Sequence, residues 1–109
     1  MNPRRGEIWW AVFDPAVGSE ISKTRPCLIL TTDVVNVHRR TVVVAPLSSS
    51  PSPCPPIRVA VRCKNRPAVA VVDQIRAISK ERSRSRLGRA SAAELEAFEA
   101  ALKEILELP

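Results

Sequence analysis

The sequence lacks an apolar run long enough to cross a membrane, and it does not begin like a secreted protein. Spanning a bilayer takes about 18 or more consecutive apolar residues, and the 109-residue chain has no such window. Its first five residues are basic, but they lead into Gly6 and Glu7 rather than into an apolar stretch with a cleavage site. These absences predict a cytoplasmic protein with no membrane role.

Cysteine and histidine, which form most thiol and metal sites, are few and scattered. Cys27, Cys54 and Cys63 are odd in number and widely spaced, which fits neither a complete disulfide framework nor a CxxC-type zinc site. We expect free thiols, with Cys27 in the core. The only histidine, His38, has no second histidine with which to share acid/base chemistry, so we expect an ordinary loop residue. The sequence thus predicts no metal site and no cofactor.

Motifs for nucleotide binding and acyl transfer are missing as well. The chain contains no Walker loop and no GxGxxG, HExxH or GxSxG sequence. A basic protein without a metal can still cleave RNA, because the 2′-hydroxyl of the substrate is the nucleophile. The protein then supplies in-line positioning, cationic stabilisation of the phosphorus centre and a proton donor for the leaving 5′-oxygen. Arginine suits the second role, since its planar fork contacts two phosphate oxygens.

Charge is distributed unevenly along the chain. Residues 1–90 carry a net charge of +10 and residues 91–109 carry −4, against +6 overall. A basic body attracts phosphate groups at long range and accelerates encounter with nucleic acid. A solvated basic surface that maintains solubility would have the same composition. Charge alone therefore leaves both interpretations open.

The apolar pattern predicts one mainly β domain, residues 1–109, closed by a helix. Short apolar or alternating runs predict strands at residues 7–13, 26–31, 41–46, 57–62 and 68–78. Residues 48–56 are rich in serine and proline, which predicts a mobile surface loop. From Ser91 the period becomes helical, beginning with a capping box to Glu94. Several strands before a single helix favour a small curved barrel over a parallel α/β sheet.

Several short motifs, in order along the chain, resemble the MazF/PemK family. Arg5-Gly6-Glu7-Ile8-Trp9 opens the chain, and Gly18-Ser19-Glu20 precedes Arg25-Pro26 at the start of an apolar strand. Residues 43–48 and the Asp73-Gln74-Ile75-Arg76 segment match the next elements, and the acidic terminal helix matches the last. The resemblance covers nearly the whole chain, and ordered motifs are more specific than any single one.

The resemblance implies an SH3-like barrel of the MazF/PemK/CcdB type that forms a homodimer. It also implies a type II toxin of the RNA interferase class, which cuts single-stranded RNA at specific sequences without a metal. Attack by the 2′-hydroxyl would leave 2′,3′-cyclic phosphate and 5′-hydroxyl ends. The expected partner is a MazE-like antitoxin that lays an extended acidic C-terminal segment over the RNA groove.

The same resemblance assigns candidate site residues. Arg25 matches the catalytic arginine and Ser48 the hydroxyl position, although Arg25 could also cap a strand and Ser48 could be a loop hydroxyl. Glu20 is either the general base, because arginine is difficult to deprotonate, or a structural carboxylate that holds Arg25. The polar side chains expected to contact RNA are those of Ser19, Lys23, Asn36, Gln74, Arg76, Arg82, Arg84 and Arg86.

Three features leave the RNA contacts open. The alternating arginines of residues 82–86 predict either a phosphate track or a charged edge strand. Many relatives carry Gly-Gly between the glutamate and the arginine, whereas residues 21–24 fill that loop with bulkier side chains here. We expect one of Trp9 and Trp10 to lie in the core, and the other to stack on an RNA base or to pack at the dimer interface.

Two other functions are compatible with this sequence. A non-enzymatic toxin on the same fold could poison DNA gyrase, but a gyrase-binding protein has no need of the Arg25 and Ser48 pair. A catalytically inactive RNA-binding module is the second alternative, and only a cleavage assay with Arg25→Ala as control distinguishes it. We therefore predict the endoribonuclease.

Overall fold

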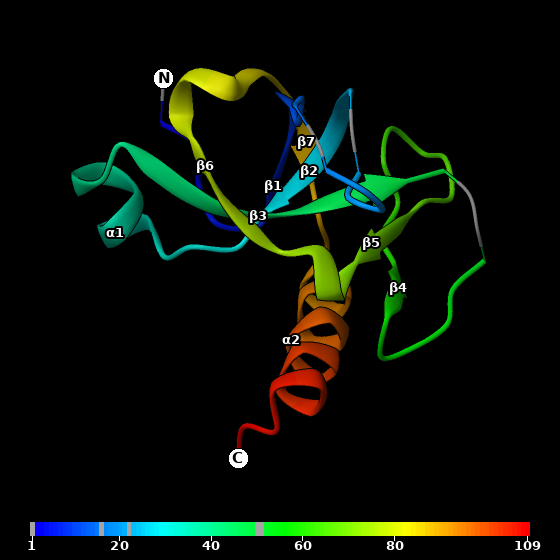
Figure 1. Cartoon of the computed structure of the whole chain (residues 1–109). Helices are drawn as coiled ribbons and strands as arrows, with labels where there is room; N and C mark the ends of the chain where they lie inside the picture. The colour runs from blue at the N-terminus through cyan, green and yellow to red at the C-terminus, as the bar shows by residue number, and fades with distance from the viewer. Residues whose placement is uncertain (1, 16, 22, 50–51) are drawn as a thin grey trace.

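An antiparallel sheet with one long helix packed against it forms the molecule (Figure 1). The computed structural model describes residues 2–15, 17–21, 23–49 and 52–109. The elements in chain order are β1 (Glu7–Val12), β2 (Thr24–Ile29), α1 (Asp33–His38), β3 (Thr41–Ser48), β4 (Arg58–Ala60), β5 (Val69–Val71), η1 (Val72–Gln74), β6 (Arg76–Ser79), η2 (Lys80–Arg82), β7 (Ser83–Arg89) and α2 (Ala92–Leu106). Among the described residues, no helix is long and apolar enough to span a membrane.

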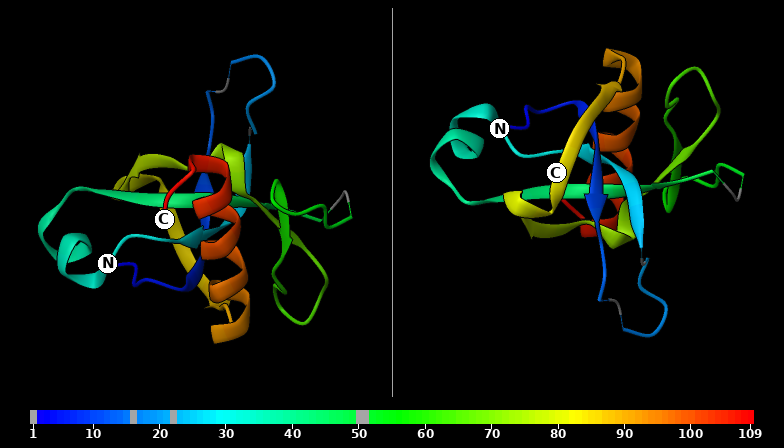
Figure 2. Two further views of the ribbon diagram at one scale, coloured as in Figure 1. Left: turned by 90° about the horizontal axis from the view of Figure 1, so that it is seen from below. Right: turned by 90° about the horizontal axis from the view of Figure 1, so that it is seen from above.

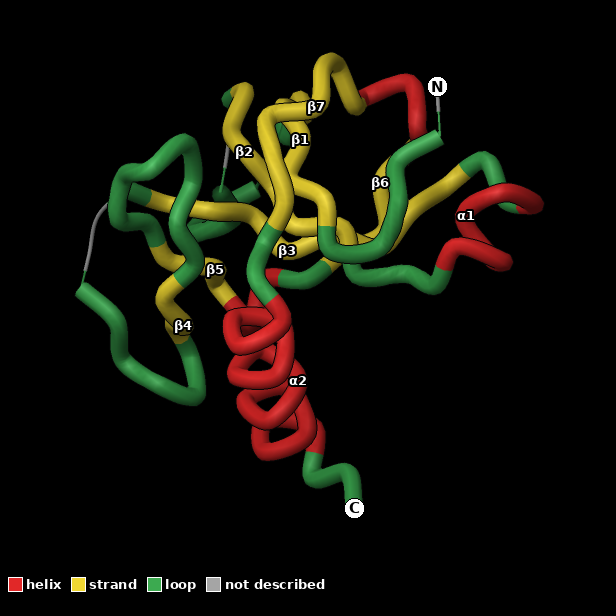
Figure 3. Tube along the Cα trace, turned by 180° about the vertical axis from the view of Figure 1, so that it is seen from behind, coloured by secondary structure: helices red, strands yellow, loops and turns green. Residues whose placement is uncertain are grey.

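The strands follow the order β4-β5-β3-β2-β1-β7, with β6 also paired to β3. The β1–β7 pairing shifts register on both sides of Trp9, as β-bulges do, and such irregularities bend the strand. Among the described residues, β4 and β7 end the sheet and do not pair with each other. The sheet is therefore not closed, and the expected mainly β fold with a C-terminal helix is confirmed (Figure 3).

The apolar core consists of two clusters, which correspond to the two directions in which strand side chains alternate. Ile8 and Leu28 belong to the cluster that α2 covers with Phe98. Their neighbours Trp9 and Cys27 belong to the other cluster, between β1, β2, β3 and β6. All three cysteines are free thiols, as expected. Burial raises the pKa of Cys27 to about 12, so this thiol stays protonated and inert.

The helix α2 begins where the capping box predicts. Ser91 Oγ accepts a hydrogen bond of 3.1 Å from the Glu94 backbone N–H, and Glu94 Oε1 accepts one of 2.8 Å from the Ser91 N–H. Such a cap stabilises a helix by about 1 kcal/mol. The second oxygen, Glu94 Oε2, accepts a hydrogen bond of 2.7 Å from the backbone N–H of Arg62. The same carboxylate therefore ties the start of α2 to the segment after β4.

Two expectations about local structure were wrong. The short helix α1 occupies a stretch that is half valine, a weak helix former, and His38 is its last residue rather than a loop residue. The Asn36 side chain holds this helix, since Nδ2 donates a hydrogen bond of 2.8 Å to the Thr31 carbonyl. Residues 68–78 form two strands rather than one, because η1 redirects the chain from one half of β3 to the other.

A buried carboxylate joins the edge strand β7 to β1. Glu7 is 8% exposed, and its Oε1 accepts hydrogen bonds from the Arg4 N–H at 2.8 Å and Trp9 Nε1 at 3.1 Å. Its Oε2 pairs with Arg86 Nε at 2.8 Å. Burial alone would raise the pKa of Glu7, but the two hydrogen bonds and the charges of Arg86 and Arg89 outweigh it. The pKa of Glu7 is lowered from its ordinary value of 4.5.

Replacing Glu7 with glutamine is expected to destabilise the fold at neutral pH by about 1.5–3 kcal/mol, the usual contribution of hydrogen bonds to a charged group. A lowered pKa stabilises the folded state above the unfolded pKa, and this contribution is lost as pH falls through the folded value. The difference between wild type and Glu7→Gln should therefore shrink below about pH 4.5. Urea unfolding from pH 3 to pH 7 measures this difference in unfolding free energy. Glu96→Gln, at an exposed position, is the control. A difference between wild type and Glu7→Gln that does not change with pH would contradict the role of the Glu7 charge.

Candidate active site

Arg25 and Ser48 lie on neighbouring strands, at the end of β3 away from α1 (Figure 1). The β2–β3 pairing aligns Cys27 with Pro46 and Leu28 with Ala45. The pairing ends there, and Arg25 and Ser48 each lie two residues beyond it, toward the same end of the two strands. A guanidinium and a hydroxyl so placed can reach the same phosphate group.

Both residues line an open pocket of about 310 Å³, the Arg25 pocket. Its walls come from β1, β2, the end of β3 and the segment between β4 and β5. Trp10 lines this pocket and is 37% exposed, whereas Trp9 is buried in the core. The expectation that one tryptophan is in the core is thus confirmed. A half-exposed indole beside a guanidinium provides both a stacking surface and a phosphate ligand.

Cys63 and Arg66, which were not among the predicted site residues, also line the Arg25 pocket. Burial raises the pKa of the Cys63 thiol, although the nearby charge of Lys64 opposes this effect. A protonated thiol is a poor nucleophile, so Cys63 contributes to the wall rather than to the chemistry. Nothing in the local sequence marks Arg66, because its place in the pocket depends on the pairing of β4 with β5.

Glu20, Gln74 and Arg76 meet in a second pocket of about 300 Å³, the Gln74 pocket. Gln74 Oε1 accepts a hydrogen bond of 2.8 Å from the Ile21 N–H. The Arg76 guanidinium lies 6.0 Å from the centre of the Phe13 ring, within the range of a cation–π contact. The structure thus brings three predicted residues together, in a pocket whose lining differs from that of the Arg25 pocket.

Ser19, Glu20 and Lys23 belong to the loop between β1 and β2, which projects from the sheet in both views of Figure 2. Glu20 Oε1 accepts a hydrogen bond of 2.7 Å from the Val17 N–H, which closes a tight turn. Lys23 is exposed, and its backbone adopts the left-handed conformation, with a φ of 70°. Ser22, together with Ser50 and Pro51 of the predicted 48–56 loop, lies outside the described residues.

The other predicted RNA contacts have structural partners of their own. Asn36 is 1% exposed within α1, so its side chain is not displayed at either pocket. Arg82 Nη1 donates to the carbonyls of Val12 and Asp14, at 3.1 and 2.5 Å. Arg84 Nη1 donates to the Glu81 carbonyl at 2.6 Å, and Arg86 pairs with Glu7. Each of the three alternating arginines therefore supports a different backbone or carboxylate group, and their contact with RNA stays a prediction.

Comparison with known sequences identifies relatives over almost the whole chain. A family model described as PemK-like, MazF-like toxin of type II toxin–antitoxin system matches residues 4–106. Endoribonuclease MazF9 of Mycobacterium tuberculosis is 37% identical over 119 residues, covering 96% of this chain and 97% of the relative. Endoribonuclease EndoA of Bacillus subtilis is 32% identical over 87 residues, or 75% of each chain.

Solved structures share the fold. MazF from Deinococcus radiodurans superposes with a TM-score of 0.87 at 24% identity, over 98% of both chains. An endoribonuclease from Mycobacterial species, solved in complex with its cognate antitoxin, superposes with a TM-score of 0.80 at 24% identity, over 98% of this chain and 97% of that one. At this identity, the superpositions establish the fold alone. Taken with the sequence matches, they show that the chain belongs to the PemK/MazF family of toxins of type II toxin–antitoxin systems.

Proposed function

We propose that this chain is the toxin of a type II toxin–antitoxin system and that it cleaves single-stranded RNA in the Arg25 pocket. The observation that carries the proposal is that Arg25 and Ser48 line one open pocket at the same end of β2 and β3. Family membership supports it, as do the relatives named endoribonucleases in two bacteria. The net charge of +10 over residues 1–90 favours a polyanionic substrate.

In the proposed reaction, the 2′-oxygen of one nucleotide attacks the adjacent phosphorus and the bond from phosphorus to the 5′-oxygen breaks. The products are a 2′,3′-cyclic phosphate and a 5′-hydroxyl; one proton leaves the 2′-hydroxyl and one is delivered to the 5′-oxygen. The Arg25 guanidinium stabilises the charge that develops on the non-bridging oxygens. The Ser48 hydroxyl donates to the same phosphate and holds it in line. These groups need no metal for the reaction.

We assign Glu20 a structural role in its own loop, which is neither the general base nor the carboxylate that holds Arg25. Its carboxylate closes the β1–β2 turn through Val17 and lines the Gln74 pocket rather than the Arg25 pocket. There it lies with Gln74 and Arg76, which we propose as contacts for nucleotides flanking the cut site. Ser19 and Lys23 extend the same surface along the projecting loop. Trp10 offers a stacking surface on the other side of Arg25.

The proposed partners follow from family membership and charge. We propose that a MazE-like antitoxin covers this basic surface with an acidic segment; one neighbouring structure is an endoribonuclease with its cognate antitoxin. We further propose that the toxin acts as a homodimer in the cytoplasm. If dimerisation builds the RNA groove, a stable monomeric variant should cleave RNA more slowly than the dimer.

The test of the proposed function is cleavage of a long single-stranded RNA by the purified protein in excess EDTA. We expect discrete cuts with 5′-hydroxyl and cyclic phosphate ends, located by primer extension and end-group analysis. The Arg25→Ala variant should cut the same RNA far more slowly, which excludes a contaminating nuclease. RNA that remains intact with the wild type over a wide range of protein concentrations would refute the proposal. A gyrase supercoiling assay would then test the non-enzymatic alternative.

A further inference from the structure

A tight turn between β4 and β5 carries Arg66 into the Arg25 pocket. Cys63 and Arg66 exchange two backbone hydrogen bonds of 3.0 Å, which closes a two-residue turn. Its central residues, Lys64 and Asn65, have φ values of 51° and 62°. Positive φ at both positions is the type I′ geometry that matches the twist of a hairpin, although non-glycine residues seldom adopt it. The backbone position of Arg66 is therefore set by a defined turn.

Among the residues that the structure describes, none forms a hydrogen bond or ion pair with the Arg66 guanidinium, and Arg66 is exposed. Nearby arginines differ: Arg62 Nη2 donates to the Asn65 carbonyl at 2.5 Å, and Arg58 Nε donates to the Ser52 carbonyl at 3.1 Å. Arg66 therefore adds to the pocket a charge and donors that internal contacts do not use.

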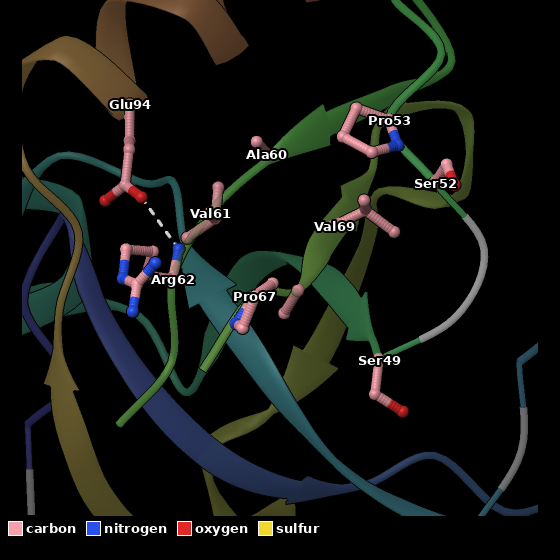
Figure 4. Close-up of a pocket in the computed structure, with 10 residues that line it drawn as sticks. Ser49, Ser52, Pro53, Ala60, Val61, Arg62, Pro67, Val69 and Glu94 are labelled. Atoms are coloured by element: carbon pink, nitrogen blue, oxygen red, sulfur yellow. Dashed lines mark hydrogen bonds between the residues drawn. The ribbon is translucent and has the colours of Figure 1, made fainter. Parts of the chain in front are cut away.

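The turn is fixed at its base by α2. The Glu94 carboxylate accepts from the Arg62 N–H with one oxygen and from the Ser91 N–H with the other, at 2.7 and 2.8 Å. Figure 4 shows the hydrogen bond between Glu94 and Arg62 at the edge of a larger pocket of about 850 Å³, which Pro67 and Ser49 also line. That pocket and the Arg25 pocket share Ser49, Pro67 and Ala68 in their linings. Arg66 lines the Arg25 pocket and directly precedes Pro67, so it lies next to the lining that the two pockets share.

We propose that Arg66 binds the RNA phosphate next to the scissile one and directs the strand from the Arg25 pocket into the adjoining larger pocket. The inference rests on the proposed function, because it assigns a further contact for the same substrate. Proteins hold single strands by cationic groups that follow the backbone, with bases stacked alongside. A contact to a flanking phosphate forms equally in the ground state and in the transition state. It therefore acts on KM rather than on kcat.

The test compares Arg66→Ala, Arg66→Lys and Lys64→Gln on a short RNA with one cut site. Lys64→Gln removes one charge from the same turn, but Lys64 does not line the Arg25 pocket. We expect Arg66→Ala to raise KM by about tenfold, as for one lost phosphate contact, with kcat nearly unchanged. Arg66→Lys should lie in between, because lysine keeps the charge without the bidentate fork. Lys64→Gln should behave like wild type.

Binding of the same RNA with a 2′-deoxy nucleotide at the cut site separates this inference from the nuclease proposal. This oligonucleotide cannot be cleaved, so its Kd is measurable for every variant. The salt dependence of log Kd should weaken by about 0.7 for Arg66→Ala, the slope for one phosphate on a single strand. Equal Kd and slope for Arg66→Ala and Lys64→Gln would overturn the role of Arg66, even if the wild type cleaves RNA. Wild-type binding without cleavage would overturn the nuclease and leave the binding measurement decisive.

Discussion

Replacing Arg25 with alanine is expected to lower kcat for RNA cleavage by about 10²- to 10³-fold, the cost of removing one preorganised donor from a developing oxyanion. The reason is that the Arg25 guanidinium lines the same open pocket as the Ser48 hydroxyl. Arg25→Lys should retain part of the rate, because lysine keeps the charge but loses the planar fork. Single-turnover cleavage of an RNA with one cut site measures the effect at saturating enzyme.

The matched control for Arg25 is Arg39→Ala. Arg39 is exposed and lies at the end of α1, just before the start of β3. Ser48 is at the other end of β3, so Arg39 is away from the Arg25 pocket. The Arg39→Ala variant removes the same charge from the basic residues 1–90, so it tests whether the loss of one positive charge is enough to slow cleavage. We expect Arg39→Ala to cleave within about twofold of wild type, since exposed substitutions away from a site change little. Equal rates for the two variants would move the chemistry away from the Arg25 pocket.

Much of the fold follows from local patterns in the sequence. The helix α2 was predictable because a capping box and an apolar period of 3.6 coincide from Ser91 onward. The meeting of Arg25 and Ser48 in one pocket was not readable from period alone, since it depends on how β2 and β3 align. Resemblance to a family supplied that pair of residues in advance. The same resemblance pointed to Gln74 and Arg76, which do share a pocket.

Other features depended on contacts between distant segments. Asn36 has the side chain of an RNA ligand, but the packing of α1 buries it at 1% exposure. The arginines of residues 82–86 alternate as a phosphate track would, yet in the fold each has a separate partner. Arg66 gave no sequence signal, because only the pairing of β4, β5 and β3 brings the turn beside Arg25.

Glu94 connects the stability of α2 to the shape of the site. One of its oxygens caps the helix and the other holds the backbone at Arg62. The helix itself contributes no residue to the lining of the Arg25 pocket. It influences the site through the segments that it packs against, among them the hairpin that carries Arg66. Loosening α2 should disturb substrate binding before it disturbs the chemistry at Arg25 and Ser48.

Replacing Phe98 with alanine is expected to destabilise the fold by about 3–5 kcal/mol, the usual cost of truncating a buried phenylalanine. Phe98 is 1% exposed and packs from α2 into the cluster that contains Ile8 and Leu28. The free energy of unfolding of a small domain is about 5–15 kcal/mol, so this loss would be a large fraction of the total. Urea unfolding monitored by circular dichroism measures the change. It is repeated at several protein concentrations, because self-association would make the apparent stability depend on concentration.

The control for Phe98 is Leu106→Ala, near the end of the same helix. Leu106 is 51% exposed, so its truncation removes a similar apolar side chain without opening a buried cavity. We expect a loss below about 1 kcal/mol for Leu106→Ala. Similar losses for the two variants would mean that α2 is stabilised along its length rather than by its buried face. Below its unfolding transition, Phe98→Ala should keep the wild-type kcat because Phe98 does not itself line the Arg25 pocket.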